Sequence, residues 1–284
     1  MPRVSVVIPC YNGGAFLPGA LQSLKEQSYG DFEIIIADDG SDDPHTLKVL
    51  EELDGARLVR QENKGLPAAR NAGMTAASAN LLLPLDCDDL LEPAFLEKMV
   101  ETLDANPEKA FAFPYLRMTG DKQGTLAKDY NFFTQLFLNQ LPYCMLLRRG
   151  AWQSVGGYDE AMTKGYEDWE FNIRLGAHGF HGVAMRAPLF VYKVGSRGML
   201  QTVSARLHSQ LWRDIQRRHP ELYRLGALLA ARKEWRDEAF AYPAWMLMGM
   251  LAAHRVLPSS LFNLLFARLQ GRSASARADR AEES

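Results

Sequence analysis

Two aspartates separated by one residue, Asp86 and Asp88, follow the apolar run 81–85. Side chains at positions i and i+2 of an extended chain project to the same side, so both carboxylates can approach one cation or its phosphate ligands. Carboxylate oxygens suit Mg²⁺ or Mn²⁺, which keep open coordination positions for substrate phosphates. The alternative is an acidic turn in which Asp89 or Glu92 caps the following helix. A divalent-metal site is the chemical hypothesis for this segment.

Two further polar clusters also end apolar runs. Cys10, Tyr11 and Asn12 follow the run 4–8, and Asp38 with Asp39 follows the run 33–37. Asp38 and Asp39 suit an ordinary turn as well as a nucleotide contact. In open α/β sheets, ligands bind outside the carboxyl ends of the strands. If the three strands are parallel neighbours, their loops form one binding site.

The elements that must position these loops alternate along the first half of the chain. Short apolar runs predict strands at 4–8, 33–37, 57–60 and 81–85, and three- or four-residue spacing predicts helices at 16–24, 46–53, 67–77 and 93–103. Continuous apolar strands between amphipathic helices indicate an α/β fold with a mostly parallel sheet covered on both faces.

The second half is less regular. It contains strand-like runs at 111–113, 144–147 and 183–194, helix-like runs at 167–177 and 204–217, and a helical pattern from 222 onward. We expect one domain over 1–220, with two halves at about 1–110 and about 111–220. A helical extension at 221–272 and a disordered tail at 273–284 complete the prediction.

Composition limits the function classes. The 284 residues carry a net charge of −2, which gives no reason to expect nucleic-acid binding. Three distant cysteines offer neither a disulfide framework nor zinc spacing, so reduced thiols in a cytoplasmic protein are expected. No signal peptide is recognised, and the uncharged stretch 239–254 is shorter than the ~20 residues of a membrane span.

Six ordered segments together resemble the family-two glycosyltransferases, over about residues 3–195. The segment 4–12 resembles their opening strand, and 35–41 resembles their second nucleotide-binding strand. Residues 63–65 with 68–73 resemble the segment beside the diphosphate, and 85–89 resembles the D-x-D metal motif. The segments 156–160 and 166–170 resemble the acceptor-side motif that holds the catalytic base. The resemblance implies a GT-A fold, a nucleotide-sugar donor, a divalent metal and inversion at the anomeric carbon. It also implies that the half at about 1–110 binds the donor and the half at about 111–220 binds the acceptor.

The resemblance also implies roles at the donor side. Asp88 would bind Mn²⁺ or Mg²⁺ directly, while Asp86 would contact the ribose or a metal-bound water. Arg70 would neutralise phosphate or hold Asp86; a surface charge is the alternative. The remaining nucleotide-binding candidates are Pro9, Tyr11, Asn12, Asp38, Asp39 and Lys64.

The resemblance gives three further candidates in the second half of the chain. Asp168 is the preferred general base and Glu167 the second choice, with helix capping as the alternative role for both. His208 would complete the metal shell, unless it is an ordinary surface histidine. The glycine-rich segment 195–198 suits a loop that orders over the diphosphate, where Arg197 could contact phosphate.

We therefore expect an inverting transferase that uses a nucleotide sugar, with a UDP-sugar favoured, and a saccharide or lipid-linked saccharide as acceptor. Cell-surface polysaccharide or glycolipid synthesis is the expected setting. A non-catalytic sugar-nucleotide or partner-binding module is the alternative. A sugar nucleotidyltransferase would need a basic glycine-rich loop where 11–17 has no Lys or Arg, and a dehydrogenase would need G-x-G-x-x-G after the first strand.

The C-terminal segment suggests a location. Residues 239–254 are uncharged and rich in aromatic, Leu and Met side chains, and Arg255, Arg268 and Arg272 flank the apolar segments. This pattern is typical of an interfacial helix beside anionic headgroups. We expect a cytoplasmic protein at the inner face of the membrane, unless the segment packs on the catalytic domain or forms a homodimer.

Overall fold

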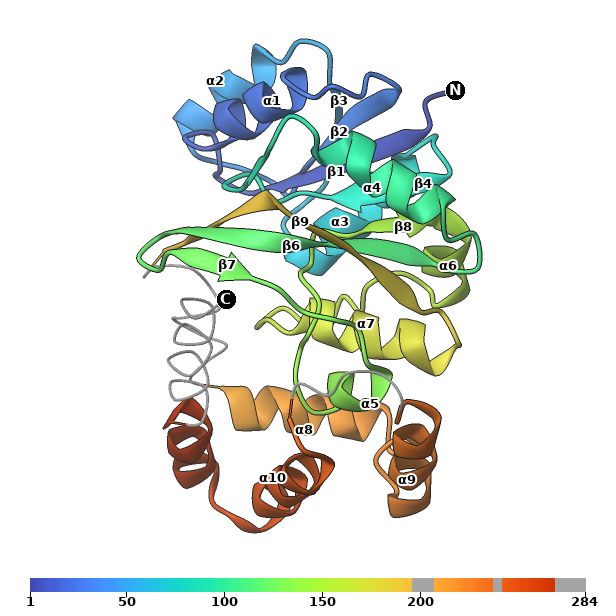
Figure 1. Ribbon diagram of the computed structural model, residues 1–284. Helices are drawn as coiled ribbons and strands as arrows, with labels where there is room; N and C mark the ends of the chain where they lie inside the picture. The colour runs from blue at the N-terminus through green and yellow to red at the C-terminus, as the bar shows by residue number, and fades with distance from the viewer. Residues whose placement is uncertain (196–206, 237–241, 269–284) are drawn as a thin grey trace.

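A computed structural model describes residues 1–195, 207–236 and 242–268 (Figure 1). Strands and helices alternate in its first half, as the apolar periodicity predicts. The elements are β1 (Val4–Cys10), α1 (Leu17–Lys25), β2 (Phe32–Asp38), α2 (Pro44–Glu51), β3 (Arg57–Arg60), α3 (Leu66–Ala76), β4 (Leu81–Pro84), β5 (Leu90–Leu91) and α4 (Phe95–Asp104).

The second half adds longer strands and more helices. Its elements are β6 (Phe111–Gly120), β7 (Gly124–Leu126), α5 (Phe132–Gln135), β8 (Leu146–Arg148), α6 (Arg149–Ser154), α7 (Glu167–Ala177), β9 (Gly182–Val194), α8 (His208–Arg218), α9 (Leu225–Glu234) and α10 (Ala244–Val256). Helical residues also run from 259 to 268.

One mixed sheet contains all the strands of the described residues. Its order is β3-β2-β1-β4-β8-β6-β9-β5, and β7 pairs with β6 outside this order. The first four strands are parallel neighbours, as the sequence predicts. β8 is antiparallel to both β4 and β6, whereas β6 and β9 are parallel over most of their length. The carboxyl ends of β1, β2 and β4 therefore lie along one edge.

Successive strand residues point to opposite faces of the sheet. Both faces are buried. Val7 and Ile35 face a core that also contains side chains of α5, α6, α7 and α8. Val6, Ile8 and Ile36 face a second core built with α1 and α4. In Figure 1, α1 and α2 lie at the top of the view beside β2 and β3, and α7, α5 and the C-terminal helices lie below the strands. The predicted coverage of both faces is confirmed.

α10 and the helical residues 259–268 pack on the rest of the protein through buried apolar side chains. Leu247, Leu251 and Phe262 are buried in the same core as Trp212 and Phe137. Among the described residues, every helix falls short of the length and apolar character that a bilayer span requires. The predicted tail 273–284 lies outside the described residues.

Candidate active site

The three polar loops predicted to share one edge are joined by backbone hydrogen bonds. The Asp39 N–H donates to the Cys10 carbonyl at 2.8 Å, and the Leu85 N–H donates to the Val7 carbonyl at 2.9 Å. The Asn12 N–H donates to the Ser41 hydroxyl at 3.0 Å. The ends of β1, β2 and β4 thus form one continuous rim.

Asp39 and Asn12 hold the loops of this rim in place. One Asp39 oxygen accepts hydrogen bonds from Gln61 and the Lys64 N–H, and the other accepts from the Gly65 N–H. The Asn12 side-chain oxygen accepts from two successive N–H groups, at 42 and 43. Both residues were predicted as nucleotide ligands, and both also build the loop framework.

The other predicted donor-side residues differ in access. Tyr11 is 51% exposed at the end of β1, so its ring is open to a ligand. Lys64 is exposed, whereas Pro9 is buried within the sheet. Asp38 is buried, with one oxygen 3.3 Å from Arg60 Nε and the other accepting from the Ser41 N–H. Of these residues, Tyr11 and Lys64 offer the freest side chains at the rim.

Arg70 links the loop after β4 to the start of α7. This α3 residue is only 1% exposed, so the alternative of a surface charge is wrong. Its Nη2 lies 2.8 Å from an Asp86 carboxylate oxygen, and its Nη1 lies 2.8 Å from Glu167. The guanidinium carbon lies 4.8 Å from the centroid of the Tyr143 ring, a cation–π distance. The interpretation that Arg70 holds Asp86 is confirmed.

Asp88 is exposed beside the partly buried Asp86, and in the described part of the chain no other residue donates a hydrogen bond to its carboxylate. Partial desolvation, and then the negative charge of Asp86, raise the pKa of Asp88. A divalent cation would offset that repulsion and would find open carboxylate oxygens here, so the donor set fits Mg²⁺ or Mn²⁺. Of the two aspartates of the predicted metal motif, Asp88 is the one whose carboxylate would be open to such an ion.

Asp89 has a structural position that sequence reasoning missed. It is 2% exposed, and it accepts hydrogen bonds from the Tyr143 hydroxyl at 2.6 Å and from the Lys193 N–H at 2.8 Å. Burial, with the charge of Asp86, raises the pKa of Asp89 to about 8. Tyr143 also accepts from the Asp86 N–H at 3.0 Å. Asp89 and Tyr143 therefore anchor the D-x-D loop to β9.

The two base candidates lie at the start of α7. Asp168 accepts a hydrogen bond from Asn139 at 2.9 Å on one oxygen and from the Trp169 N–H at 2.8 Å on the other. Desolvation raises the pKa of Asp168, although Arg70 opposes the shift. Burial also raises the pKa of Glu167 to about 7. Asp168 is the less buried of the two, while Glu167 is tied to Arg70.

The segment predicted to lie beside the diphosphate and the predicted acceptor-side segment are joined by hydrogen bonds. The Asn71 side chain accepts from the Tyr158 N–H at 2.8 Å and donates to the Tyr158 carbonyl at 2.9 Å. A Cβ on Gly73 would lie 2.3 Å from Val7, so only glycine lets α3 approach β1 this closely. The segments 68–73 and 156–160 thus meet below the rim.

His208 is placed apart from the aspartates. It is 3% exposed among aromatic rings, with the Phe266 ring centroid 3.8 Å away, and its Nδ1 lies 2.8 Å from the Tyr166 hydroxyl. Burial lowers the pKa of His208 to about 3. Within the described ranges, no three His, Cys, Asp or Glu side chains converge as a metal site. His208 is therefore not a surface histidine, nor does the structure bring it together with Asp86 and Asp88. The loop with Arg197 lies outside the described residues.

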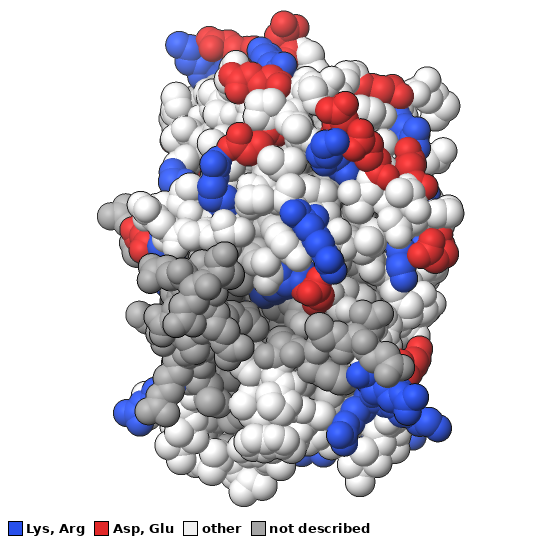
Figure 2. Space-filling view, in the orientation of Figure 1, with Lys and Arg blue, Asp and Glu red and all other residues white. Residues whose placement is uncertain are grey.

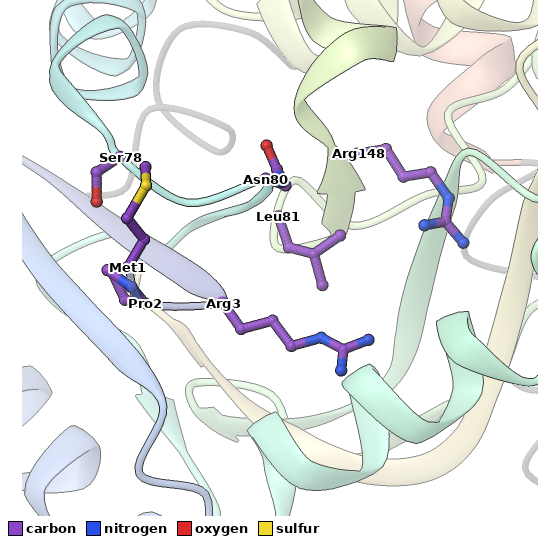
Figure 3. Close-up of a pocket in the computed structure, with 7 residues that line it drawn as sticks. All are labelled: Met1, Pro2, Arg3, Ser78, Asn80, Leu81 and Arg148. Atoms are coloured by element: carbon purple, nitrogen blue, oxygen red, sulfur yellow. The ribbon is translucent and has the colours of Figure 1, made fainter.

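A separate pocket lies at the opposite end of the strands. Figure 3 shows it at the beginning of β1 and β4, lined by Met1, Pro2, Arg3, Ser78, Asn80, Leu81 and Arg148. Because ligands of open α/β sheets bind at the carboxyl ends of strands, we keep the rim as the candidate site.

Comparison with known proteins agrees with this architecture. The family model described as Glycosyl transferase family 2 matches residues 5–157. A curated relative, the chondroitin synthase of Escherichia coli, is 27% identical over 188 residues, covering 63% of this chain and 27% of that protein. This chain thus spans less than a third of that relative's length.

Two solved structures share the fold. Residues 1–349 of S. aureus TarS, in complex with UDP-GlcNAc, give a TM-score of 0.62 at 17% identity, covering 75% of this chain and 65% of that chain. The mannosyltransferase PcManGT from Pyrobaculum calidifontis, in complex with GDP-Man and Mn²⁺, gives a TM-score of 0.56 at 18% identity. That match covers 97% of this chain and 86% of that chain. The predicted fold class is confirmed.

Proposed function

The chain belongs to glycosyl transferase family 2, and we propose that it is a metal-dependent, inverting transferase that moves a sugar from a nucleotide-diphosphate sugar to a hydroxyl acceptor. The observation that carries this proposal is the Arg70 linkage. It connects Asp86, next to the exposed Asp88, with Glu167, next to Asp168. A leaving-group site and a base site are thus joined through one buried side chain.

The donor side suits a nucleotide diphosphate. The open Tyr11 ring offers a surface for a base, and Lys64 offers a positive charge on the same rim. TarS is in complex with UDP-GlcNAc, and PcManGT with GDP-Man and Mn²⁺. We favour a UDP-sugar as the donor, with Mn²⁺ or Mg²⁺ held by Asp88.

The proposed reaction is a single displacement. When bound, the divalent ion stabilises the negative charge of the departing diphosphate. Asp168 accepts the proton of the acceptor hydroxyl as that oxygen attacks C1 of the sugar. Asn139 and the Trp169 N–H keep the Asp168 carboxylate oriented, and Arg70 fixes Asp86 beside the metal ligand.

The acceptor belongs to the less regular half of the chain. We propose a saccharide or a lipid-linked saccharide, in the synthesis of cell-surface polysaccharide or glycolipid. The similarity to a chondroitin synthase supports a polysaccharide setting. We place the protein in the cytoplasm, at the inner face of the membrane.

Donor hydrolysis tests the proposal. The chain is incubated with UDP-, GDP- and dTDP-sugars, with and without Mn²⁺, and nucleotide release is measured. We expect Mn²⁺-dependent release from UDP-sugars; no release from any donor at any metal concentration would contradict transferase activity. Once an acceptor is found, an α-linked donor should yield a β-linked product by NMR, and retained configuration would exclude the single displacement.

A further inference from the structure

Two thiols meet directly beside the proposed metal loop. Cys10 is the last residue of β1, and Cys87 stands between Asp86 and Asp88. Both cysteines are free, and both belong to the core cluster on one face of the sheet. Cys10 is buried, whereas Cys87 is partly exposed. A hydrogen bond between the two thiols lowers the pKa of Cys10, against the effect of burial.

The strand register explains why they meet. β1 and β4 are parallel, with Val7 opposite Pro84. Cys10 and Cys87 each follow those residues by three positions. The Leu85 N–H still donates to the Val7 carbonyl, and the turn that begins at Cys87 follows directly, beside the end of β1.

Gly13 shows that the sulfurs share one small space. A Cβ placed on Gly13 would lie 2.6 Å from Cys87 Sγ and 3.3 Å from Cys10 Sγ. Any other residue at this position would displace the pair. The third cysteine, Cys144, is buried elsewhere in the core, and it offers an internal comparison.

We propose that Cys10 and Cys87 form an oxidation site, at which hydrogen peroxide converts the two thiols into a disulfide that restrains the D-x-D loop and suppresses its metal-supported activity. The activity part rests on the proposed function, whereas formation of the bond does not. The disulfide would fix Cys87, which lies between Asp86 and Asp88. The carboxylates of these two aspartates have different neighbours. Asp86 is held by Arg70, so strain in the loop would displace the exposed Asp88.

The chemistry balances in two steps. The sulfur of one of the two cysteines attacks one peroxide oxygen, the O–O bond breaks, and that cysteine becomes a sulfenic acid as water leaves. The sulfur of the other cysteine then attacks the sulfenic sulfur, the S–S bond forms, and the hydroxyl leaves with the proton of the second thiol as a second water. Two thiols are oxidised and one peroxide is reduced.

Peptide mapping tests whether the bond forms. The reduced full chain is treated with hydrogen peroxide, alkylated without reductant, digested and analysed by mass spectrometry. We expect a Cys10–Cys87 linked peptide and an alkylated Cys144. Alkylation of all three cysteines after treatment would overturn the proposal, as would oxidation of Cys10 or Cys87 to sulfonic acid without a linked peptide.

Function is followed on the same samples by UDP binding with Mn²⁺ in a calorimeter and by donor hydrolysis. Loss of positioning around a metal typically costs about 10- to 100-fold in metal affinity or activity. We therefore expect UDP affinity and donor hydrolysis to fall by that factor after oxidation, and dithiothreitol to restore both. Cys144→Ala should keep this response, and Cys87→Ala should abolish it. If Cys87→Ala fails to fold, Cys10→Ala replaces it and should abolish the response in the same way.

The two measurements separate this inference from the proposed function. A chain that never hydrolyses a donor can still form the disulfide and change its affinity for UDP with Mn²⁺. A linked peptide with unchanged UDP affinity and unchanged hydrolysis would overturn the regulatory part of the proposal.

Discussion

Asp86, Asp88 and Asp89 lie in one loop, yet their surroundings divide their roles. Asp86 is bound by Arg70, and Asp89 is buried against Tyr143. Asp88 alone of the three is exposed. A metal ion binds where carboxylate oxygens are open and where its charge relieves repulsion. At the residue scale, the neighbours of the three aspartates rather than their residue type favour Asp88 as the proposed ligand.

We expect Asp88→Asn to lose metal-supported donor turnover. A residue that binds the metal ion directly contributes several kcal/mol of transition-state stabilisation. Every ~1.4 kcal/mol is a factor of ten in rate. A loss of about a hundredfold or more should appear in hydrolysis with saturating Mn²⁺. Asp54→Asn, at an exposed aspartate after α2, is the matched control. Equal turnover in both variants would show that Asp88 is not the ligand.

Asp168→Asn should separate chemistry from donor binding. A general base is typically worth about 10² to 10⁴ in rate, whereas Asp168 is expected to make no contact with the nucleotide. Transfer should therefore fall by that factor while calorimetry finds unchanged UDP affinity with Mn²⁺. Loss of UDP binding in this variant would assign Asp168 to the donor site instead.

Glu167→Gln should separate the two base candidates by pH dependence. Desolvation raises the pKa of Asp168, and the base must be ionised, so transfer should increase as pH rises through that pKa. The negative charge that adds to this shift is that of Asp86, whereas the charge of Asp168 helps to raise the pKa of Glu167 to about 7. Glu167→Gln should therefore leave the acid limb of kcat/KM in place. A loss of about 10² to 10⁴ in transfer at every pH would instead identify Glu167 as the base.

At the scale of elements, Arg70 ties α3 to the end of β4 and to α7. Its two nitrogens reach Asp86 and Glu167, and its side chain is 1% exposed. Breaking a buried ion pair leaves an uncompensated charge, which typically costs about 3–5 kcal/mol. Arg70 therefore contributes to the mutual position of the three elements that carry the site.

Arg70→Met should reduce the free energy of unfolding by about 3–5 kcal/mol at neutral pH. Denaturant titration measures this loss, which should shrink on acidification as Glu167, with its pKa of about 7, becomes neutral. Arg186→Met removes an exposed ion pair with Asp129, and should cost only about 0–1 kcal/mol. Similar losses in both variants would mean that the buried linkage adds no stability.

The sequence predicts the elements that depend on local pattern. β3 and α7 have the predicted bounds, and α3 differs by one residue at each end. The sequence analysis missed β5 and α5. β5 is a pairing of two residues with β9, and α5 is a single turn of helix. Both depend on contacts with residues that are distant in the sequence. The same limit explains why Asn139 was missed: it follows no motif, and its role exists only because Asp168 packs against it.

At the scale of the whole molecule, the C-terminal helices have two unlike sides. Leu247, Leu251 and Phe262 are buried against the catalytic half, so part of the alternative interpretation, packing on the protein, is confirmed. The opposite side exposes large apolar residues, with Trp245 at 77% and Leu264 at 50%. Basic side chains gather nearby: Figure 2 shows Lys and Arg over the region of α9, whose last turn carries Arg232 and Lys233.

Exposed aromatic and aliphatic side chains beside basic residues suit the headgroup region of an anionic bilayer. We therefore expect the full chain to float with anionic vesicles in a density gradient, and to float less as salt is raised, because the electrostatic part is screened. Trp245→Ser combined with Leu264→Ser should weaken flotation and leave the buried core covered. A truncation before α10 would instead expose that core. Leu90→Ser, at an apolar residue 40% exposed in β5, is the control. If the full chain stays at the bottom of the gradient and elutes as a dimer in gel filtration, these helices join two copies of the chain, and the membrane assignment is wrong.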